Sequence, residues 1–424
     1  MEGPGINCAP SSPAVRVLQL CHKPPFPPID GGTKAMHGIT MGLINAGHEV
    51  KVLCICTPKH PLEIAAMPKE YRDATGIEGI FTDTSLNIVD AFADLVTADN
   101  YNISRFFSAD MDIRLIRLLS AEQFDVVLLE SLFATPYLPT IRRYSHARIV
   151  LRSHNLEHVI QERMANSETN VFKKPYRRFL AKQLKAYEVA VLDRVDGVAA
   201  ITPADAEHFM SHGSKTPIIT IPFGVDPSEY PATEPAGAPV FFHLGSMDWL
   251  PNEEGIRWLL ANVWPKVIKA HPKAKLHLAG NKMPKDLLAL ELPGLHVNGR
   301  VPDADLYMSK RHVMVVPLFS AGGMRVKIIE GMAMGKCVIS TPIGAEGISC
   351  TDGEDILLAR NATEMVDRIN SIIEEPERAR AIGTKARALI HTHYANERIV
   401  RDLIAFFGQL GKVSSAQSAS ADKT

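Results

Sequence analysis

The segment from His312 to Gly347 constrains the fold of this chain most strongly. It begins with a continuous apolar run, 313–317, which is typical of a strand buried on both faces of a parallel sheet. After the loop 320–323, apolar residues recur at helical spacing until Gly335, which is expected to end the helix. A second strand is predicted directly afterwards, at 337–340. The segment therefore predicts a strand–helix–strand unit whose helix begins at a glycine loop.

The first turn of this predicted helix carries two cations, Arg325 and Lys327. A helix N-terminus is already positive, so each cation there costs about 0.3–1 kcal/mol unless an anion is bound. Together with the backbone amides of the preceding loop, Gly322, Gly323 and Met324, they form a suitable seat for a phosphate or diphosphate. The alternative is that Arg325 reaches into water and Lys327 forms an ion pair within the helix.

Glu330 is the third unusual residue of this helix. Its spacing places a carboxylate beside the apolar stripe, where it needs a partner. One interpretation is an i,i+3 ion pair with Lys327, worth a few tenths of a kcal/mol, about what such pairs contribute. The other is that Glu330 accepts hydrogen bonds from a bound ligand.

Predicted strands and helices alternate along the whole chain in two halves, and 424 residues are too many for one ordinary core. We therefore expect an α/β protein with two doubly wound domains, at 15–225 and 240–394. Residues 226–239 contain four prolines and no apolar period, so they are expected to be a linker without a packed element. A C-terminal helix at 395–411 is expected to pack back on the first domain. Residues 1–14 and 412–424 are expected to be disordered tails.

Two Asp-x-Asp sequences, at Asp110/Asp112 and Asp303/Asp305, have the form of a metal-binding signature. Both also lie where helices are predicted to begin, and acids are favoured in a first turn. We therefore predict first-turn acids and no metal site. Asn252 is likewise predicted to cap a helix. The loop before the first predicted helix, with Gly31 and Gly32, lacks GxGxxG, which argues against a classical NAD site.

Composition excludes several classes of protein. A net charge of −1 argues against a general nucleic-acid binder. The six cysteines lack zinc-site spacing, the N-terminus has no signal-peptide pattern and no apolar run approaches about 20 residues, so a cytoplasmic protein is expected. The basic stretch 173–185 with interleaved aromatics is interpreted as a solvated helix. Peripheral contact with the inner face of a membrane remains the alternative.

The run from Gly322 through Glu330 to Gly347, GGMRVKIIEGMAMGKCVISTPIGAEG, resembles the donor-binding segment of GT-B retaining glycosyltransferases of family 4. Asp30-Gly31-Gly32 and the His154-Asn155 pair are similar to other segments of that family. The resemblance implies two Rossmann-like domains that face a cleft. It also implies transfer of a sugar from a nucleotide-diphosphate sugar to a hydroxyl, with retention of configuration, in polysaccharide or glycoconjugate synthesis. The acceptor would be a sugar, a lipid-linked sugar or a small molecule.

The resemblance also implies residue roles. His154 would orient the transferred sugar, Arg325 and Lys327 would stabilise the leaving diphosphate without a metal or other cofactor, and Glu330 would bind the ribose. Further donor contacts would come from Gly31, Gly32, Gly245, Ser246, Arg300, Val301, Gly322, Gly323 and Met324. One departure concerns the Glu-x7-Glu pattern of many members, because Gly322 occupies the position of the first carboxylate. A GT-B sugar-nucleotide epimerase and an inactive nucleotide-sugar-binding subunit are the alternatives.

Overall fold

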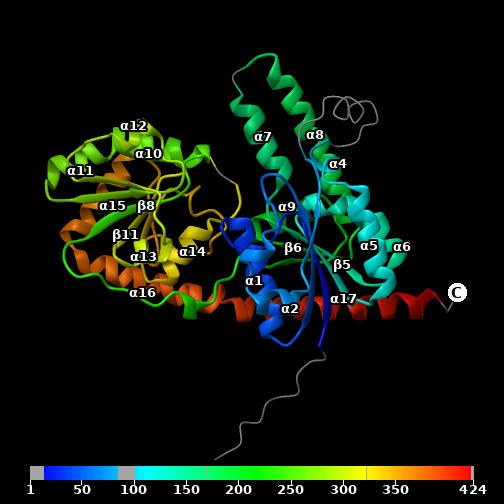
Figure 1. Ribbon diagram of the computed structural model, residues 1–424. Helices are drawn as coiled ribbons and strands as arrows, with labels where there is room; N and C mark the ends of the chain where they lie inside the picture. Colours follow the sequence, from blue (N-terminus) through cyan, green and yellow to red (C-terminus); the bar gives the residue numbers. More distant parts are fainter. Residues whose placement is uncertain (1–13, 85–100, 169, 321, 422–424) are drawn as a thin grey trace, which may run out of the picture.

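The computed structural model describes residues 14–84, 101–168, 170–320 and 322–421. Two parallel sheets form two units that lie side by side, with helices on both faces of each (Figure 1). The expected α/β class with two doubly wound, Rossmann-like units is confirmed. Nearly all of the expected N-terminal tail, and residues 422–424 of the C-terminal one, lie outside the described residues.

The first unit is built on a seven-stranded sheet with the order β3-β2-β1-β4-β5-β6-β7. Its strands are β1 (Arg16–Cys21), β2 (Glu49–Cys56), β3 (Glu78–Phe81), β4 (Val126–Glu130), β5 (Arg148–Ser153), β6 (Gly197–Ala200) and β7 (Ile218–Thr220). Its helices are α1 (Gly31–Asn45), α2 (Lys69–Thr75), α4 (Tyr101–Ser104), α5 (Ala109–Ala121), α6 (Leu138–Tyr144), α7 (Glu157–Ser167), α8 (Lys173–Leu192) and α9 (Pro203–Ser211). The strand order reverses between β1 and β4, where α/β sheets usually bind ligands.

The second unit has a six-stranded sheet with the order β10-β9-β8-β11-β12-β13. Its strands are β8 (Val240–Leu244), β9 (Lys275–Ala279), β10 (Leu295–Gly299), β11 (Val313–Val316), β12 (Cys337–Ser340) and β13 (Leu357–Leu358). Its helices are α10 (Leu250–Asn262), α11 (Trp264–Ala270), α12 (Lys285–Leu288), α13 (Ala304–Ser309), α14 (Val326–Ala333), α15 (Ala362–Glu374) and α16 (Pro376–His393). The β11–α14–β12 unit confirms the strand–helix–strand prediction, and Gly335 follows the helix with φ of 75°.

The connection between the units is more structured than its composition indicates. A short 3-10 turn spans Pro227–Glu229, and Tyr230 behind it is 8% exposed and packs in the core of the second unit. The expectation that 226–239 contains no packed element is therefore wrong. One apolar ring is enough to anchor an otherwise extended segment.

The last helix, α17 (Asn396–Ala421), returns to the first unit and runs along it (Figure 1). Its apolar residues Ile399, Val400, Leu403, Phe406 and Phe407 pack in the core formed by α1 and the sheet. The helix continues to Ala421, so the expectation of a tail from 412 is wrong for 412–421. Extending an existing helix avoids the costly nucleation step that an isolated segment would face.

Helix starts explain both Asp-x-Asp sequences. Ser108 caps α5, with Asp110 and Asp112 in its first turn, and Asp303 caps α13 by accepting from the Leu306 amide at 2.9 Å. The interpretation as helix-start acids is confirmed. The predicted cap at Asn252 is wrong, because α10 begins two residues earlier at Leu250. Pro251 suits a first turn, and this leaves Asn252 inside the helix with its side chain buried.

Candidate active site

A cavity of about 280 Å³ lies between the two units. On the first unit it is bordered by the loops that follow β1, β4 and β5, and by the start of α1. On the second unit it is bordered by the start of α14. Its walls are formed by His22, Lys23, Gly31, Gly32, Ala35, Ser131, Phe133, His154, Asn155, Glu157, Ile201, Phe223, Met324 and Val326. The cavity therefore occupies the carboxyl edge of the first sheet, beside its switch point.

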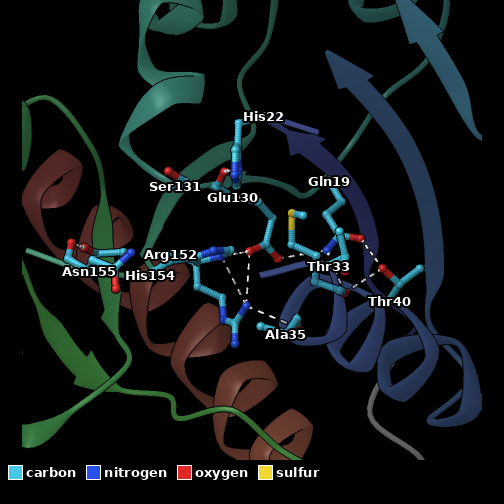
Figure 2. A network of polar contacts seen from close by, with 12 residues as sticks. Gln19, His22, Thr33, Ala35, Thr40, Glu130, Ser131, Arg152, His154 and Asn155 are labelled. Carbon is cyan, nitrogen blue, oxygen red and sulfur yellow. Dashed lines mark hydrogen bonds and ion pairs between the residues drawn. The ribbon is translucent and has the colours of Figure 1, made fainter. Parts of the chain in front are cut away.

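His154 is held in this wall by a buried polar network (Figure 2). Its Nε2 lies 2.6 Å from Oε2 of Glu130, which also accepts from Nη1 of Arg152 at 3.1 Å. The other oxygen of Glu130 accepts from Nε2 of Gln19 at 2.8 Å, and Thr40 donates to Gln19 at 2.6 Å. Glu130 and Arg152 are fully buried. The ring position of His154 is thus fixed through three strands of the sheet and α1.

The charges of this network follow from its contacts. Burial alone would raise the pKa of Glu130, but the Arg152 guanidinium and His154 lower it to about 2, so Glu130 is ionised at neutral pH. Burial lowers the pKa of His154, although Glu130 opposes the shift. A neutral His154 must donate its Nε2 proton to the carboxylate. Its Nδ1 is then the ring nitrogen that can accept a hydrogen bond.

Arg325 and Lys327 lie at the start of α14, as predicted, and both are buried or half-buried. Arg325 occupies the N-cap position, donates through Nε to Gly323 O at 3.0 Å, and lies over the Trp249 ring at 5.2 Å. The amine of Lys327 donates to Oδ1 of Asn252 at 2.9 Å. Burial lowers the pKa of Arg325 to about 10, and burial together with Arg325 lowers that of Lys327 to about 7. Among the described residues neither has a carboxylate within ion-pair distance, so the pair would be stabilised by an anion.

The loop before α14 contacts the opposite unit directly. Gly323 has φ of 72°, and a Cβ atom there would lie 2.2 Å from Oδ1 of Asn155. A Cβ on Gly322 would lie 3.0 Å from Ile160 of α7. Gly323 therefore allows the loop to approach the end of β5, and Gly322 allows it to approach α7. Ala321 lies outside the described residues.

Glu330 is buried and does not pair with Lys327, so the alternative of an i,i+3 ion pair is wrong. Its carboxylate forms an ion pair with Lys34 of α1 and accepts from the hydroxyl of Tyr230 at 3.2 Å. Burial raises the pKa of Glu330, and Lys34 opposes the shift. The amine of Lys327 is turned toward Asn252 of α10, which leaves Glu330 to a lysine of the other unit. Glu330 therefore links the two units.

The other predicted donor residues are divided between the cavity and its surroundings. Gly31, Gly32, Met324 and His154 line the cavity. Gly245 lies behind it, where a Cβ atom would be 2.9 Å from the Lys327 amine. The remaining positions lie further away: Ser246 donates to Asp248 at 2.5 Å, and the turn of Arg300 and Val301 follows β10 with Arg300 exposed.

Sequence reasoning missed several side chains of the wall. Lys23 donates to both oxygens of Asp30 at 2.8 Å, and His22 donates from Nδ1 to the Glu130 carbonyl at 2.9 Å. Glu157 accepts from Asn155 at 3.2 Å, and burial and the nearby Glu188 raise its pKa to about 7. Each of these residues follows the carboxyl end of a strand, and this common position was the available signal.

Two family models match the chain: Glycosyltransferase Family 4 over residues 29–229 and Glycosyl transferases group 1 over residues 238–375. A Klebsiella pneumoniae protein described as an uncharacterized 44.6 kDa protein in cps region is 24% identical over 388 residues, which are 88% of this chain and 95% of that protein.

Solved structures share the two-unit fold. Sucrose-phosphate synthase of Thermosynechococcus elongatus matches with a TM-score of 0.67 at 16% identity, over 94% of this chain and 100% of its own. HepE of Anabaena, solved with UDP and glucose, matches with a TM-score of 0.64 at 15% identity, over 93% and 99%. TarM matches with a TM-score of 0.66 at 13% identity, over 93% and 98%.

Proposed function

The chain belongs to the family-4 glycosyltransferases of the GT-B fold, and from this we propose that it transfers a sugar from a nucleotide-diphosphate sugar to an acceptor hydroxyl with retention of anomeric configuration. One observation carries the proposal. His154 from the first unit and Met324 and Val326, at the start of α14 in the second, line one small cavity. Arg325 and Lys327 alternate with these two residues along the chain, but their side chains are not part of the cavity wall. The donor would place its diphosphate at α14 and its sugar toward His154.

In this reaction the bond from the anomeric carbon to the diphosphate breaks, and a bond to the acceptor oxygen forms. The acceptor proton passes to the departing phosphate oxygen. Negative charge grows on the diphosphate, and Arg325, Lys327 and the amides of Gly323 and Met324 would stabilise it. These groups supply the positive charge that a divalent cation supplies in other transferases, so we propose that no metal is required.

The other residues would position the donor. Neutral His154 would accept a hydrogen bond from a sugar hydroxyl through Nδ1. Glu330 would accept hydrogen bonds from the ribose hydroxyls. Its ion pair with Lys34 would be replaced by these hydrogen bonds when the donor binds. The backbone of Gly31 and Gly32 would border the phosphates. The complexes of HepE with UDP and UDP-glucose support a uridine nucleotide. A role in polysaccharide or glycoconjugate synthesis is proposed from the family resemblance alone.

A thermal-shift screen of UDP-, GDP- and ADP-sugars would test donor binding, because a ligand at 100 times its Kd stabilises a protein by about 2.7 kcal/mol. The best donor would then be incubated with sugar acceptors, once with and once without EDTA. NMR of the product would report its anomeric configuration. We expect a retained configuration and activity in EDTA. Inversion, or loss of activity that manganese restores, would contradict those parts of the proposal.

The same experiment separates the alternatives. An epimerase would convert the sugar nucleotide without any acceptor. A nucleotide-sugar-binding subunit would show the thermal shift and no turnover with any acceptor.

A further inference from the structure

Helices α7 and α8 form a hairpin that projects away from the sheet of the first unit (Figure 1). The apolar side chains at its far end are exposed to solvent: Val171 is 76% exposed, Phe172 89%, Tyr176 49% and Phe179 43%. Single exposed apolar residues are ordinary, but a contiguous group marks an interaction site.

The two faces of α8 show that these side chains do not serve the core. Ala181, Leu184 and Glu188 are buried and share one face of the helix. Phe172, Tyr176 and Phe179 recur at i, i+4 and i+7, so they form a separate stripe that points outward.

Basic side chains surround this aromatic stripe. Residues 168–182 contain five basic residues and one acidic residue, in a chain whose net charge is −1. Arg177 pairs with Glu168 at 3.0 Å. Lys173, Arg178 and Lys182 are exposed, and none of them forms an ion pair with a residue that the structure describes. The end of the hairpin is therefore both apolar and positively charged.

We propose that the hairpin tip, defined as Val171, Phe172, Lys173, Tyr176, Arg178, Phe179 and Lys182, binds the surface of an anionic lipid bilayer. Aromatic rings favour the headgroup level of a bilayer, and lysine and arginine are attracted to anionic lipids. A phosphate backbone alone would leave the apolar stripe without a partner. In the described parts of the chain no helix is long and apolar enough to cross a membrane, so the contact is with the surface.

The position of the hairpin connects this surface to the cavity. Helix α7 begins at Glu157, which lines the cavity, and its other end leads to the tip. Binding at the tip would hold the cavity one hairpin length from the lipid headgroups. The proposal itself does not depend on the donor or on the reaction.

Flotation of the full chain with vesicles would test the proposal. One vesicle type contains phosphatidylcholine alone, and the other an equal mixture of phosphatidylcholine and phosphatidylglycerol. We expect binding to the anionic vesicles and not to the neutral ones. The triple variant Lys173→Gln, Arg178→Gln, Lys182→Gln should bind about 100-fold more weakly, since each charge contributes about fivefold. Val171→Ser with Phe172→Ser should also weaken binding at unchanged charge.

A matched control removes the same charge elsewhere. Lys266→Gln, Lys269→Gln, Lys273→Gln changes three exposed lysines on and beside α11 and should bind like the parent. Equal melting temperatures would show that all variants are folded. Absence of parent binding to anionic vesicles, or equal weakening in the α11 control, would overturn the proposal. So would a parent oligomer that Phe172→Ser converts to a monomer in light scattering, because the tip would then bind a second copy.

Discussion

Among the residues that the structure describes, no carboxylate lies within ion-pair distance of the buried cations Arg325 and Lys327. We therefore expect each cation to lower the stability of the ligand-free protein and to raise the rate of the reaction. In the folded protein the pKa of Lys327 is about 7, against an ordinary value of 10.5. Between these two pH values the unfolded chain binds more protons than the folded protein, so the free energy of unfolding increases as the pH rises. The destabilising effect of Lys327 is therefore complete below pH 7 and is lost as the pH rises through this range.

We therefore expect Lys327→Met to stabilise the ligand-free protein below pH 7 by roughly 1 kcal/mol, an effect that fades toward pH 10. Turnover should fall by about a hundred- to a thousand-fold, as for the loss of other preorganised stabilisers of developing charge. Denaturant unfolding across pH and steady-state kinetics would measure both. Arg325→Ala is the companion variant and should show the kinetic loss. Parent-like turnover in either variant would remove the diphosphate from this position.

Glu330 offers a second test at a single residue. Gln keeps an acceptor but loses the charge, and hydrogen bonds to charged groups contribute about 1.5–3 kcal/mol. We expect Glu330→Gln to lower donor affinity by about one to two decades in calorimetric titration.

Lys34→Met separates this role from the link between the units. It removes the same ion pair but leaves the acceptor that ribose would use. Lys34→Met should therefore bind donor nearly as well as the parent. If the two variants lose affinity equally, Glu330 acts through Lys34 and not on the ribose.

The hydrogen-bond and ion-pair partners of the site residues were the least predictable part of the site. The cations of α14 were found because a helix start disfavours them, and His154 was found through its family pair at a strand end. Glu130 and Arg152 were missed, because a charged residue at the end of an apolar strand normally reaches solvent. Only the neighbouring strands show that the two charges neutralise each other inside the sheet. Lys34 was missed as the partner of Glu330 because no local spacing relates 34 to 330.

Among the elements, the loop before α14 has a strict backbone requirement. Gly323 has φ of 72° and leaves no room for a Cβ beside Asn155. We expect Gly323→Ala to destabilise the protein by about 1–2 kcal/mol, the usual cost of the left-handed region. Donor affinity should fall at least tenfold, since the loop amides would move away from the diphosphate.

Gly353→Ala is the matched control for this element. Gly353 has φ of 80° and no neighbour within 4 Å of a new Cβ. It should show the loss of stability that comes from the left-handed backbone alone, with unchanged donor affinity. Equal losses of affinity in both variants would show that Gly323 acts through general stability.

Helices and strands were largely predictable where apolar residues recur at clear helical or strand spacing. The β11–α14–β12 unit follows from continuous apolar strands on either side of a helical stripe. The start of α10 was misplaced because Asn252 has a capping side chain, while its actual use is tertiary, between Lys327 and the Ser246 carbonyl at 2.8 Å. Tyr230 was hidden in a proline-rich segment, where a single apolar residue produces no period.

For the whole molecule, the volume of the cavity implies movement. At about 280 Å³ it lies just below the roughly 300–1,000 Å³ of ligand pockets, and a nucleotide-diphosphate sugar is a large ligand. Lys34–Glu330 and Gly323–Asn155 contacts hold the units together in this arrangement. Donor entry therefore requires the units to separate, so we expect the ligand-free protein to exchange between this arrangement and a distribution of more open ones. Bound donor would then shift the population to the closed arrangement.

We expect X-ray scattering to show a smaller radius of gyration at saturating donor than without ligand. Arg325→Ala with Lys327→Ala is the control, because it should remain in the open distribution at the same donor concentration. An unchanged radius in the parent at saturation would mean that the donor enters without rearrangement of the units.

Helix α17 also determines the order in which the molecule is completed during synthesis. The chain leaves the ribosome from its N-terminus, so all seven strands of the first sheet emerge long before Val400 and Leu410. Those late residues fill the space beside Gly42 and Gly197, where a Cβ would lie 2.5 Å from Val400 and 2.8 Å from Leu410. Until they arrive, an apolar face of the first unit stays uncovered, while the second unit is translated between the two parts of the first. The first half of the nascent chain therefore exposes this apolar face during synthesis, and it can reach its final packing only after α17 has been translated.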